Sequence, residues 1–107
     1  MDSYFLFYVT VSGLEEAERL AGRLVREKLA ACVNVLPGVK SFYWWKGRVD
    51  TAEECLLIGK TIGRFIDGIK SSVVDLHTYD VPEVIFVALS DGYRPYLDWI
   101  DESLDRV

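Results

Sequence analysis

The pattern of apolar and polar positions changes along this chain. Its first two segments, residues 4–11 and 14–29, predict a strand followed by a helix. Residues 4–11 form a continuous apolar and β-branched run, which is typical of a central strand buried on both faces. Residues 14–29 then repeat apolar side chains at helical spacing. Ser12 and Glu15 have the spacing of a capping box, so we expect Ser12 to cap this helix.

The middle of the chain predicts a long β-hairpin. Residues 31–45 and 48–60 read as its two strands, and Lys46-Gly47 between them is a candidate two-residue turn. Pro37-Gly38 interrupts the first strand, which indicates a bend or a β-bulge there. We therefore expect the two strands to pair along most of their length, with one irregularity.

The turn also predicts the register of this hairpin. A two-residue turn pairs Trp45 with Arg48, and this neighbourhood favours a cation–π contact between the two side chains. The same ladder places Lys40 opposite Glu53. An opposite-charge pair in this position supports the register.

A second helix, a fourth strand and a final helix complete the pattern. Thr61 is placed to cap the second helix, residues 84–89 read as another buried strand, and Asp91-Gly92 opens the last helix. The order β-α-β-β-α-β followed by a terminal helix is the ferredoxin-like pattern, so we predict an α+β fold in which residues 1–107 form a single domain. Apolar side chains mark the inner faces of the two helices: Phe65, Ile66, Ile69, Val73 and Leu76 in the second, and Tyr93, Tyr96, Leu97, Ile100 and Leu104 in the last.

The sheet of this fold is apolar on both faces. Both helical crossovers of a ferredoxin-like fold cover the same face, yet residues 42–45 place aromatic rings on both sides of the hairpin, and residues 4–9 and 56–58 are also apolar throughout. Each large apolar side chain left in water forfeits roughly 1.5–3 kcal/mol. We therefore expect a homo-oligomer that packs through its sheets, with the hairpin extending onto a neighbour. The alternative is that the terminal helix covers this face within one chain.

Charge and composition exclude several classes of function. The chain has 12 basic and 17 acidic side chains, a net charge of -5, which argues against binding to nucleic acid. No apolar run approaches the length of a membrane span, and no signal peptide is indicated. We expect a cytoplasmic protein that does not associate with a membrane.

The two cysteines are expected to be free thiols. They form neither a CxxC motif nor a zinc-ligand spacing. The predicted ladder pairs Cys32 with Thr61, or with a neighbouring residue if the bend at Pro37-Gly38 shifts the register. Cys32 and Cys55 are then several rows apart, beyond the reach of a disulfide.

Several separated motifs along the chain belong together. They are Ala31-Cys32-Val33-Asn34, then Ser41, Tyr43, Trp45 and Gly47, then Glu54 and Lys60-Thr61, then His77, Tyr79, Val81, Pro82 and Glu83, and finally Tyr96 and Trp99. With these motifs nearly the whole chain resembles the CutA divalent-cation-tolerance family. The resemblance implies a ferredoxin-like homotrimer similar to PII signalling proteins, and a link to divalent metals, copper above all.

The chain departs from the family pattern at its expected metal site. Some bacterial members are thought to bind copper through a cysteine on the first strand and two successive histidines. The matching positions here are Val9, Leu76 and His77, so two of the three ligands are absent. Thr78 and Asp80 also replace a proline and a glutamate of the family string.

His77 is the leading candidate for a metal ligand. It is the only histidine of the chain, and neutral imidazole binds Cu²⁺ and Zn²⁺. Asp80 or Glu83 can complete a mixed nitrogen–oxygen site, and Cys32 is a tentative soft ligand. Alternatively, His77 fixes the turn by hydrogen bonds to backbone, and Cys32 is a small buried hydrophobe.

An enzyme is not expected, and a small-molecule site remains an alternative. Cys32 and His77 resemble a nucleophile and a base, but nothing supplies an orienting third group or an oxyanion loop. No glycine-rich phosphate motif occurs, so a PII-like nucleotide role lacks support. The candidates for an intersubunit cleft or interface are Tyr43, Trp45, Glu54, Lys60, Tyr79 and Glu83.

These observations converge on one functional hypothesis. We predict a cytoplasmic, non-enzymatic homotrimer that takes part in the response to metal ions and binds Cu²⁺ or another divalent cation, with no organic cofactor. The alternative is a PII-like signalling or scaffolding trimer that binds a protein or a small metabolite without a metal role.

Overall fold

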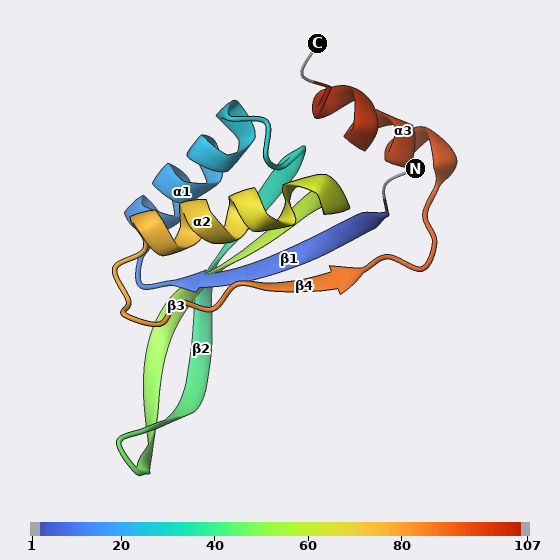
Figure 1. The fold of residues 1–107 in the computed structure, drawn as a ribbon. Helices are drawn as coiled ribbons and strands as arrows, with labels where there is room; N and C mark the ends of the chain where they lie inside the picture. Colours follow the sequence, from blue (N-terminus) through green and yellow to red (C-terminus); the bar gives the residue numbers. More distant parts are fainter. Residues whose placement is uncertain (1–2, 106–107) are drawn as a thin grey trace.

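The computed structural model describes residues 3–105, which form one antiparallel sheet with helices packed on it (Figure 1). The strands lie in the order β2-β3-β1-β4, and each neighbouring pair is antiparallel. This order and the two helical crossovers confirm the predicted ferredoxin-like α+β fold. The strands are β1 (Tyr4–Val11), β2 (Cys32–Trp45), β3 (Arg48–Ile62) and β4 (Ile85–Ala88), and the helices are α1 (Leu14–Arg26), α2 (Ile66–Leu76) and α3 (Arg94–Ser103), with a 3₁₀ turn at Gly63–Phe65 before α2.

The core lies between the sheet and the two helices α1 and α2, which cover the same face (Figure 1). Phe7, Val9 and Val11 of β1 point into this core and have no exposed surface, because alternate side chains of a strand share one face. Gly59 of β3 lies opposite Phe7, where a Cβ atom would come within 2.0 Å of the ring. The central position of β1 is confirmed, but only this face of the strand is fully buried.

The hairpin of β2 and β3 projects from the rest of the molecule (Figure 1). With the hairpin included, the molecule measures 46 × 26 × 22 Å along its principal axes. Trp45 pairs with Arg48 and Lys40 pairs with Glu53, so the predicted register of this part is confirmed. The radius of gyration is 14.5 Å. A compact domain of this length has about 13 Å, so the hairpin makes the chain elongated.

The two-residue turn is confirmed, but its cation–π contact differs from the prediction. Lys46 and Gly47 both have positive φ angles, 51° and 80°, as the hairpin turn of this length requires. The ammonium of Lys46, rather than the guanidinium of Arg48, lies over the Trp45 ring, with Nζ 5.8 Å from the centroid. The turn itself brings the neighbouring side chain onto the ring.

A β-bulge at Pro37-Gly38 shifts the ladder of β2 and β3 by one residue. Gly38 has a φ of 74°, a conformation that favours glycine. Beyond the bulge Cys32 pairs with Lys60, not with Thr61 as an uninterrupted ladder predicts. The interruption was visible in the sequence, and its effect is a shift of one residue.

Neither predicted helix cap forms. The N-cap of α1 is Gly13, and the Ser12 hydroxyl donates to the Glu16 carboxylate at 2.9 Å instead of accepting from the backbone. Thr61 still belongs to β3, and its hydroxyl donates to the Leu29 carbonyl at 2.7 Å. Ser12 therefore bonds to a residue on its own helix, and Thr61 to a residue 32 positions away in the sequence.

The face of the sheet away from α1 and α2 remains largely apolar and uncovered. The ladder places Leu6 and Tyr8 of β1 on this face beside Val87 and Ile85 of β4. Val87 and Ile85 are 47% and 53% exposed, so the prediction of a fully buried strand over residues 84–89 is wrong for this side. The strand β4 also has only four residues.

Helix α3 covers only one end of this second face. It lies near the start of β1, where the Tyr4 hydroxyl donates to Asp101 at 2.5 Å (Figure 1). Its buried side chains Leu97, Ile100 and Leu104 join the core, as predicted for the inner stripe. Tyr93 stays outside it and is 77% exposed. No helix within residues 3–105 has the length and apolarity needed to span a membrane.

Candidate functional site

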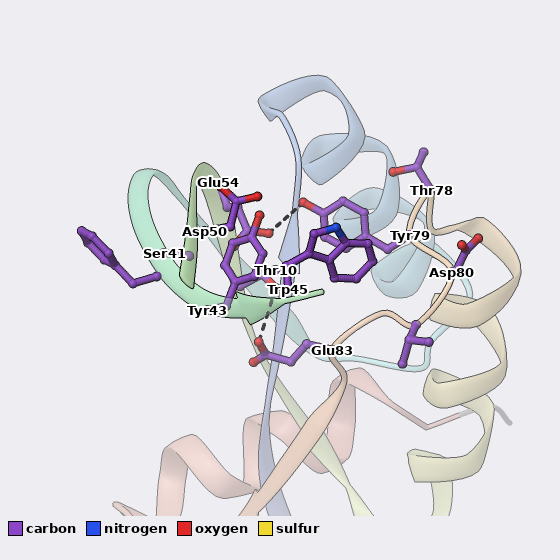
Figure 2. Close-up of a pocket in the computed structure, with 12 residues that line it drawn as sticks. Thr10, Ser41, Tyr43, Trp45, Asp50, Glu54, Thr78, Tyr79, Asp80 and Glu83 are labelled. Carbon is purple, nitrogen blue, oxygen red and sulfur yellow. Dashed lines mark hydrogen bonds between the residues drawn. The ribbon is translucent and has the colours of Figure 1, made fainter. Parts of the chain in front are cut away.

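A pocket of about 860 Å³ lies where the hairpin, the end of β1 and the segment 78–83 meet (Figure 2). The hairpin contributes one wall, and the segment between α2 and β4 contributes the other. The lining residues are Thr10, Ser41, Phe42, Tyr43, Trp45, Asp50, Glu54, Thr78, Tyr79, Asp80, Val81 and Glu83.

His77 holds the start of the segment 78–83 in place through two hydrogen bonds. Its Nδ1 accepts the backbone N–H of Tyr79 at 3.0 Å, so Nδ1 carries no proton and Nε2 does. Nε2 then donates to the Thr10 carbonyl at 2.7 Å. The side chain has no exposed surface, and both ring nitrogens are engaged in hydrogen bonds. The geometry matches the turn-fixing role that the sequence left open.

Glu16 of α1 holds the next residue of the segment. Its carboxylate accepts the backbone N–H and the hydroxyl of Thr78, each at 3.3 Å, and the Ser12 hydroxyl at 2.9 Å. Burial of Glu16 favours its neutral form, but the hydrogen bonds from Ser12 and Thr78, and the charge of His77 when it is protonated, outweigh burial and lower the Glu16 pKa. The segment is therefore anchored to α1 as well as to β1.

Tyr79 connects the two walls of the pocket. Its hydroxyl donates to Glu54 Oε2 of β3 at 2.8 Å, as the dashed line in Figure 2 shows. Burial, and then the hydrogen bond to Glu54, raise the Tyr79 pKa far above its ordinary value, so this phenol stays protonated. Its ring also packs on His77, with the ring centroids 4.6 Å apart.

The lining is acidic and has no basic side chain within the part of the chain that the structure describes. Asp50 and Glu54 come from β3, and Asp80 and Glu83 come from the 78–83 segment. Glu83 accepts the Thr10 hydroxyl at 3.3 Å. A pocket with four carboxylates attracts cations and repels phosphates.

The structure brings most of the predicted cleft residues together. Tyr43, Trp45, Glu54, Tyr79 and Glu83 all line this pocket. Their strands and segment lie far apart in the sequence, so only the fold makes them neighbours.

One predicted residue lies elsewhere, and six lining residues were predicted neither for the cleft nor as metal ligands: Thr10, Ser41, Phe42, Asp50, Thr78 and Val81. Asp50 pairs with Tyr43, and the predicted register already placed these two residues opposite each other. Thr10 had no signal of its own within the apolar first strand. Lys60 is not in the pocket: its ammonium bonds to the Asn34 side chain and lies 4.0 Å from the Cys32 sulfur.

Cys32 and His77 lie apart, so neither a thiol–imidazole pair nor a shared metal site forms within one chain. Cys32 pairs with Lys60 of β3. His77 contacts Thr10, and Thr10 pairs with Leu56, which is four residues from Lys60 on β3. This separation is about 13 Å along a strand. The thiol-enzyme alternative therefore loses its base. Among residues 3–105, no group of three His, Cys, Asp or Glu side chains converges as metal ligands.

Comparison with known proteins agrees with this fold. The family model of the CutA1 divalent ion tolerance proteins matches residues 5–103. The chain is 49% identical over 96 residues to "Protein CutA 1, chloroplastic" of Oryza sativa, covering 90% of this chain and 54% of the relative. It is 42% identical over 98 residues to the "Divalent-cation tolerance protein CutA" of Archaeoglobus fulgidus, covering 92% and 95% of the two chains.

Solved structures extend the likeness to three dimensions. The crystal structure of CutA1 from Oryza sativa superposes with a TM-score of 0.94 at 45% identity, covering 98% of this chain and 96% of that one. The Archaeoglobus fulgidus structure, titled a periplasmic divalent cation tolerance protein, gives a TM-score of 0.92 at 40% identity and covers 95% and 99%. The chain spans about half the length of the full rice relative. The chain therefore belongs to the CutA1 divalent ion tolerance protein family.

Proposed function

We propose that this protein takes part in the response to divalent cations by binding them reversibly, as a homotrimer, at the acidic pocket. The observation that carries the proposal is the lining of the pocket, which has four carboxylates and no basic side chain within the described residues. Carboxylate oxygens are common ligands of divalent cations. Relatives named divalent-cation tolerance proteins support the general role.

A trimer supplies what one chain lacks. Three converging ligands are absent from residues 3–105 of a single chain, so a neighbouring subunit has to complete the coordination shell. The chain exposes 6796 Å² of surface. A folded monomer of its mass exposes about 6,100 Å². We assign the apolar second face and the projecting hairpin to the neighbours.

Copper is our candidate cation, with His77 as the nitrogen ligand beside the pocket. To bind a metal through Nδ1, His77 has to release the backbone N–H of Tyr79. Cys32, the tentative sulfur ligand, is too far from His77 of the same chain to share a metal ion with it. It can act as a ligand beside His77 only if it comes from a neighbouring subunit. Glu83 and Asp80 offer oxygen ligands on the same segment.

Calorimetric titration of Cu²⁺, Zn²⁺ and Mn²⁺ tests this function. Glu83→Gln removes a lining carboxylate, and Glu53→Gln removes the same charge one residue away from the lining residue Glu54. We expect Glu83→Gln to weaken binding about tenfold, as for a lost ligand bond to a charged group, and Glu53→Gln to leave it unchanged.

His77→Ala separates copper from the oxygen-bound cations. If His77 is a ligand, the variant loses affinity for Cu²⁺ more than for Mn²⁺, because imidazole suits copper better than manganese. Equal affinities in wild type, Glu83→Gln and His77→Ala would contradict the assignment of the cation to this pocket. Retained copper binding in His77→Ala alone would remove only His77.

The second candidate function is a PII-like trimer that binds a small metabolite or a protein. The size of the pocket favours it, since ligand pockets commonly span about 300–1,000 Å³. The acidic lining argues against nucleotides and other phosphates. A neutral or cationic metabolite that raises the thermal stability of the metal-free protein would favour this second function over the first.

For the compartment we propose the cytoplasm, where both cysteines remain reduced. Cys32 and Cys55 are free in the structure. Relatives are named chloroplastic in Oryza sativa and periplasmic in Archaeoglobus fulgidus, so compartments differ within the family. Fractionation of the source cells with an antibody against the protein decides the question.

A further inference from the structure

Aromatic rings line the acidic pocket together with the carboxylates, although aromatic rings are not ligands of divalent metals. Tyr43 and Trp45 of the hairpin and Tyr79 of the facing segment line the same space as the carboxylates (Figure 2). The face of an aromatic ring attracts cations of low charge density, such as alkylammonium groups. Aromatic walls with acidic groups between them are therefore suited to an organic cation.

The carboxylates are distributed around the pocket rather than gathered at one point. Glu54 and Asp50 lie on β3, while Asp80 and Glu83 lie on the opposite wall (Figure 2). No three of them converge as a ligand group within the described residues. A point charge needs converging oxygens, whereas a flexible chain with several ammonium groups can reach separate carboxylates.

Glu54 offers an unused acceptor to such a ligand. The residue is only 8% exposed, and Oε2 accepts the Tyr79 hydroxyl. Its second oxygen, Oε1, has no hydrogen-bond partner among residues 3–105, yet every fully buried polar side-chain atom there has one. Oε1 is therefore reached from the pocket that Glu54 lines. An ammonium group in the pocket can therefore donate to Oε1 in a charge-assisted hydrogen bond.

An ammonium group of the chain already lies over the Trp45 ring, although Lys46 itself does not line the pocket. Nζ of Lys46 lies 5.8 Å from the centroid of the Trp45 ring. The contact shows that the ring is accessible to an alkylammonium and oriented to receive one. In the single chain Trp45 is 56% exposed.

We infer that this pocket binds a linear aliphatic polyamine, with ammonium groups on Glu54 and on the carboxylates of the opposite wall and with the methylene chain along Tyr43 and Trp45. The volume of about 860 Å³ suits a small flexible ligand. The inference goes beyond the proposed metal response and does not rest on it, because the aromatic walls and the separated carboxylates carry it.

Titration of spermidine into the purified protein tests the inference, by calorimetry in metal-depleted buffer. A salt concentration of about 150 mM suppresses loose attraction to the acidic surface. We expect saturable binding that Glu54→Gln weakens about tenfold, since a hydrogen bond between an ammonium group and a carboxylate is lost. Trp45→Leu should weaken it about fivefold through the loss of the ring.

Two matched variants distinguish the pocket from the general surface. Glu53→Gln and Trp44→Leu make the same changes one residue away, at positions that do not line the pocket, and should bind spermidine as wild type does. Circular dichroism confirms that each variant is folded. If the wild type does not bind spermidine, the inference is overturned. It is also overturned if all four variants bind spermidine with the same affinity. Spermidine binding without metal binding would remove the proposed function and leave this inference standing.

Discussion

Glu16 shows how a single side chain holds the functional segment at the residue scale. It sits at the start of α1 and accepts three hydrogen-bond donors, two of them from Thr78. A buried carboxylate is costly unless its lone pairs are satisfied. Because Thr78, Tyr79 and their neighbours form one wall of the pocket, the carboxylate links the stability of the fold to the shape of the site.

Replacement of Glu16 by Gln should change both stability and its pH dependence. The folded pKa lies below the ordinary value of 4.5, since hydrogen bonds outweigh burial. The stabilisation is therefore complete above pH 4.5 and is lost as the pH falls through the folded pKa. We expect Glu16→Gln to lower the free energy of unfolding by about 1–2 kcal/mol at pH 7, and by less in acid.

Urea denaturation at pH 7 and pH 4, at a fixed protein concentration, provides the measurement. Glu15→Gln is the control, because its side chain is 96% exposed and carries the same charge. Its effect should stay within about 0.5 kcal/mol at both pH values. A Glu16→Gln variant whose deficit is unchanged between pH 7 and pH 4 would contradict the role of the ionised carboxylate.

The bulge of β2 determines, at the scale of the element, which face the first half of this strand presents. Side chains alternate along a strand, so one extra residue exchanges the two faces beyond it. The Lys46-Gly47 turn pairs Val39 with Glu54 and so places Tyr43 and Trp45 on the Glu54 side. On the other side of Pro37-Gly38 the shift pairs Cys32 with Lys60 instead of Thr61.

Substitution of Gly38 should therefore cost backbone energy alone. Its φ is 74°, and a Cβ atom built there meets nothing within 4 Å. We expect Gly38→Ala to lower the free energy of unfolding by about 1 kcal/mol, the cost of the left-handed conformation. Gly38→Asn should cost less, since asparagine tolerates this region. Denaturation curves of the two variants check the order, and an asparagine variant less stable than the alanine variant would refute the backbone explanation.

The sequence predicted the elements better than the contacts between them. The Lys46-Gly47 turn fixes the register as far as the bulge, because a ladder propagates residue by residue from its turn. The bulge itself was visible as Pro37-Gly38. The predicted caps failed because the elements begin elsewhere: the N-cap of α1 is Gly13, and Thr61 still belongs to β3, where its hydroxyl donates to the Leu29 carbonyl.

The candidate site needed the whole molecule, because its walls come from segments that only the fold brings together. Family motifs identified Tyr43, Trp45, Glu54 and Tyr79, which do line the pocket. They also suggested Lys60, which belongs to the same strand as Glu54 but lies six residues further along it, beside Asn34. Residue type and spacing cannot show which part of a long strand a distant segment crosses.

The apolar second face leads to the final prediction, which concerns the assembly. Val87 of β4 is 47% exposed on this face, and α3 covers only the end near Tyr4. A trimer packed through its sheets buries Val87, so a lysine there places a charge in the interface. Val74 of α2 is 61% exposed on the helical side and serves as the matched control.

Light scattering after size-exclusion chromatography measures the outcome. The wild type and Val74→Lys should have three times the 12.2 kDa mass of one chain. Burial of one such side chain contributes about 1.5–3 kcal/mol, and this contribution occurs once per subunit. Val87→Lys should therefore shift the mass towards that of one chain on dilution, while circular dichroism stays unchanged. A wild type that elutes as a monomer would contradict the interface, and a Val87→Lys trimer as stable as the control would place the interface elsewhere on the sheet.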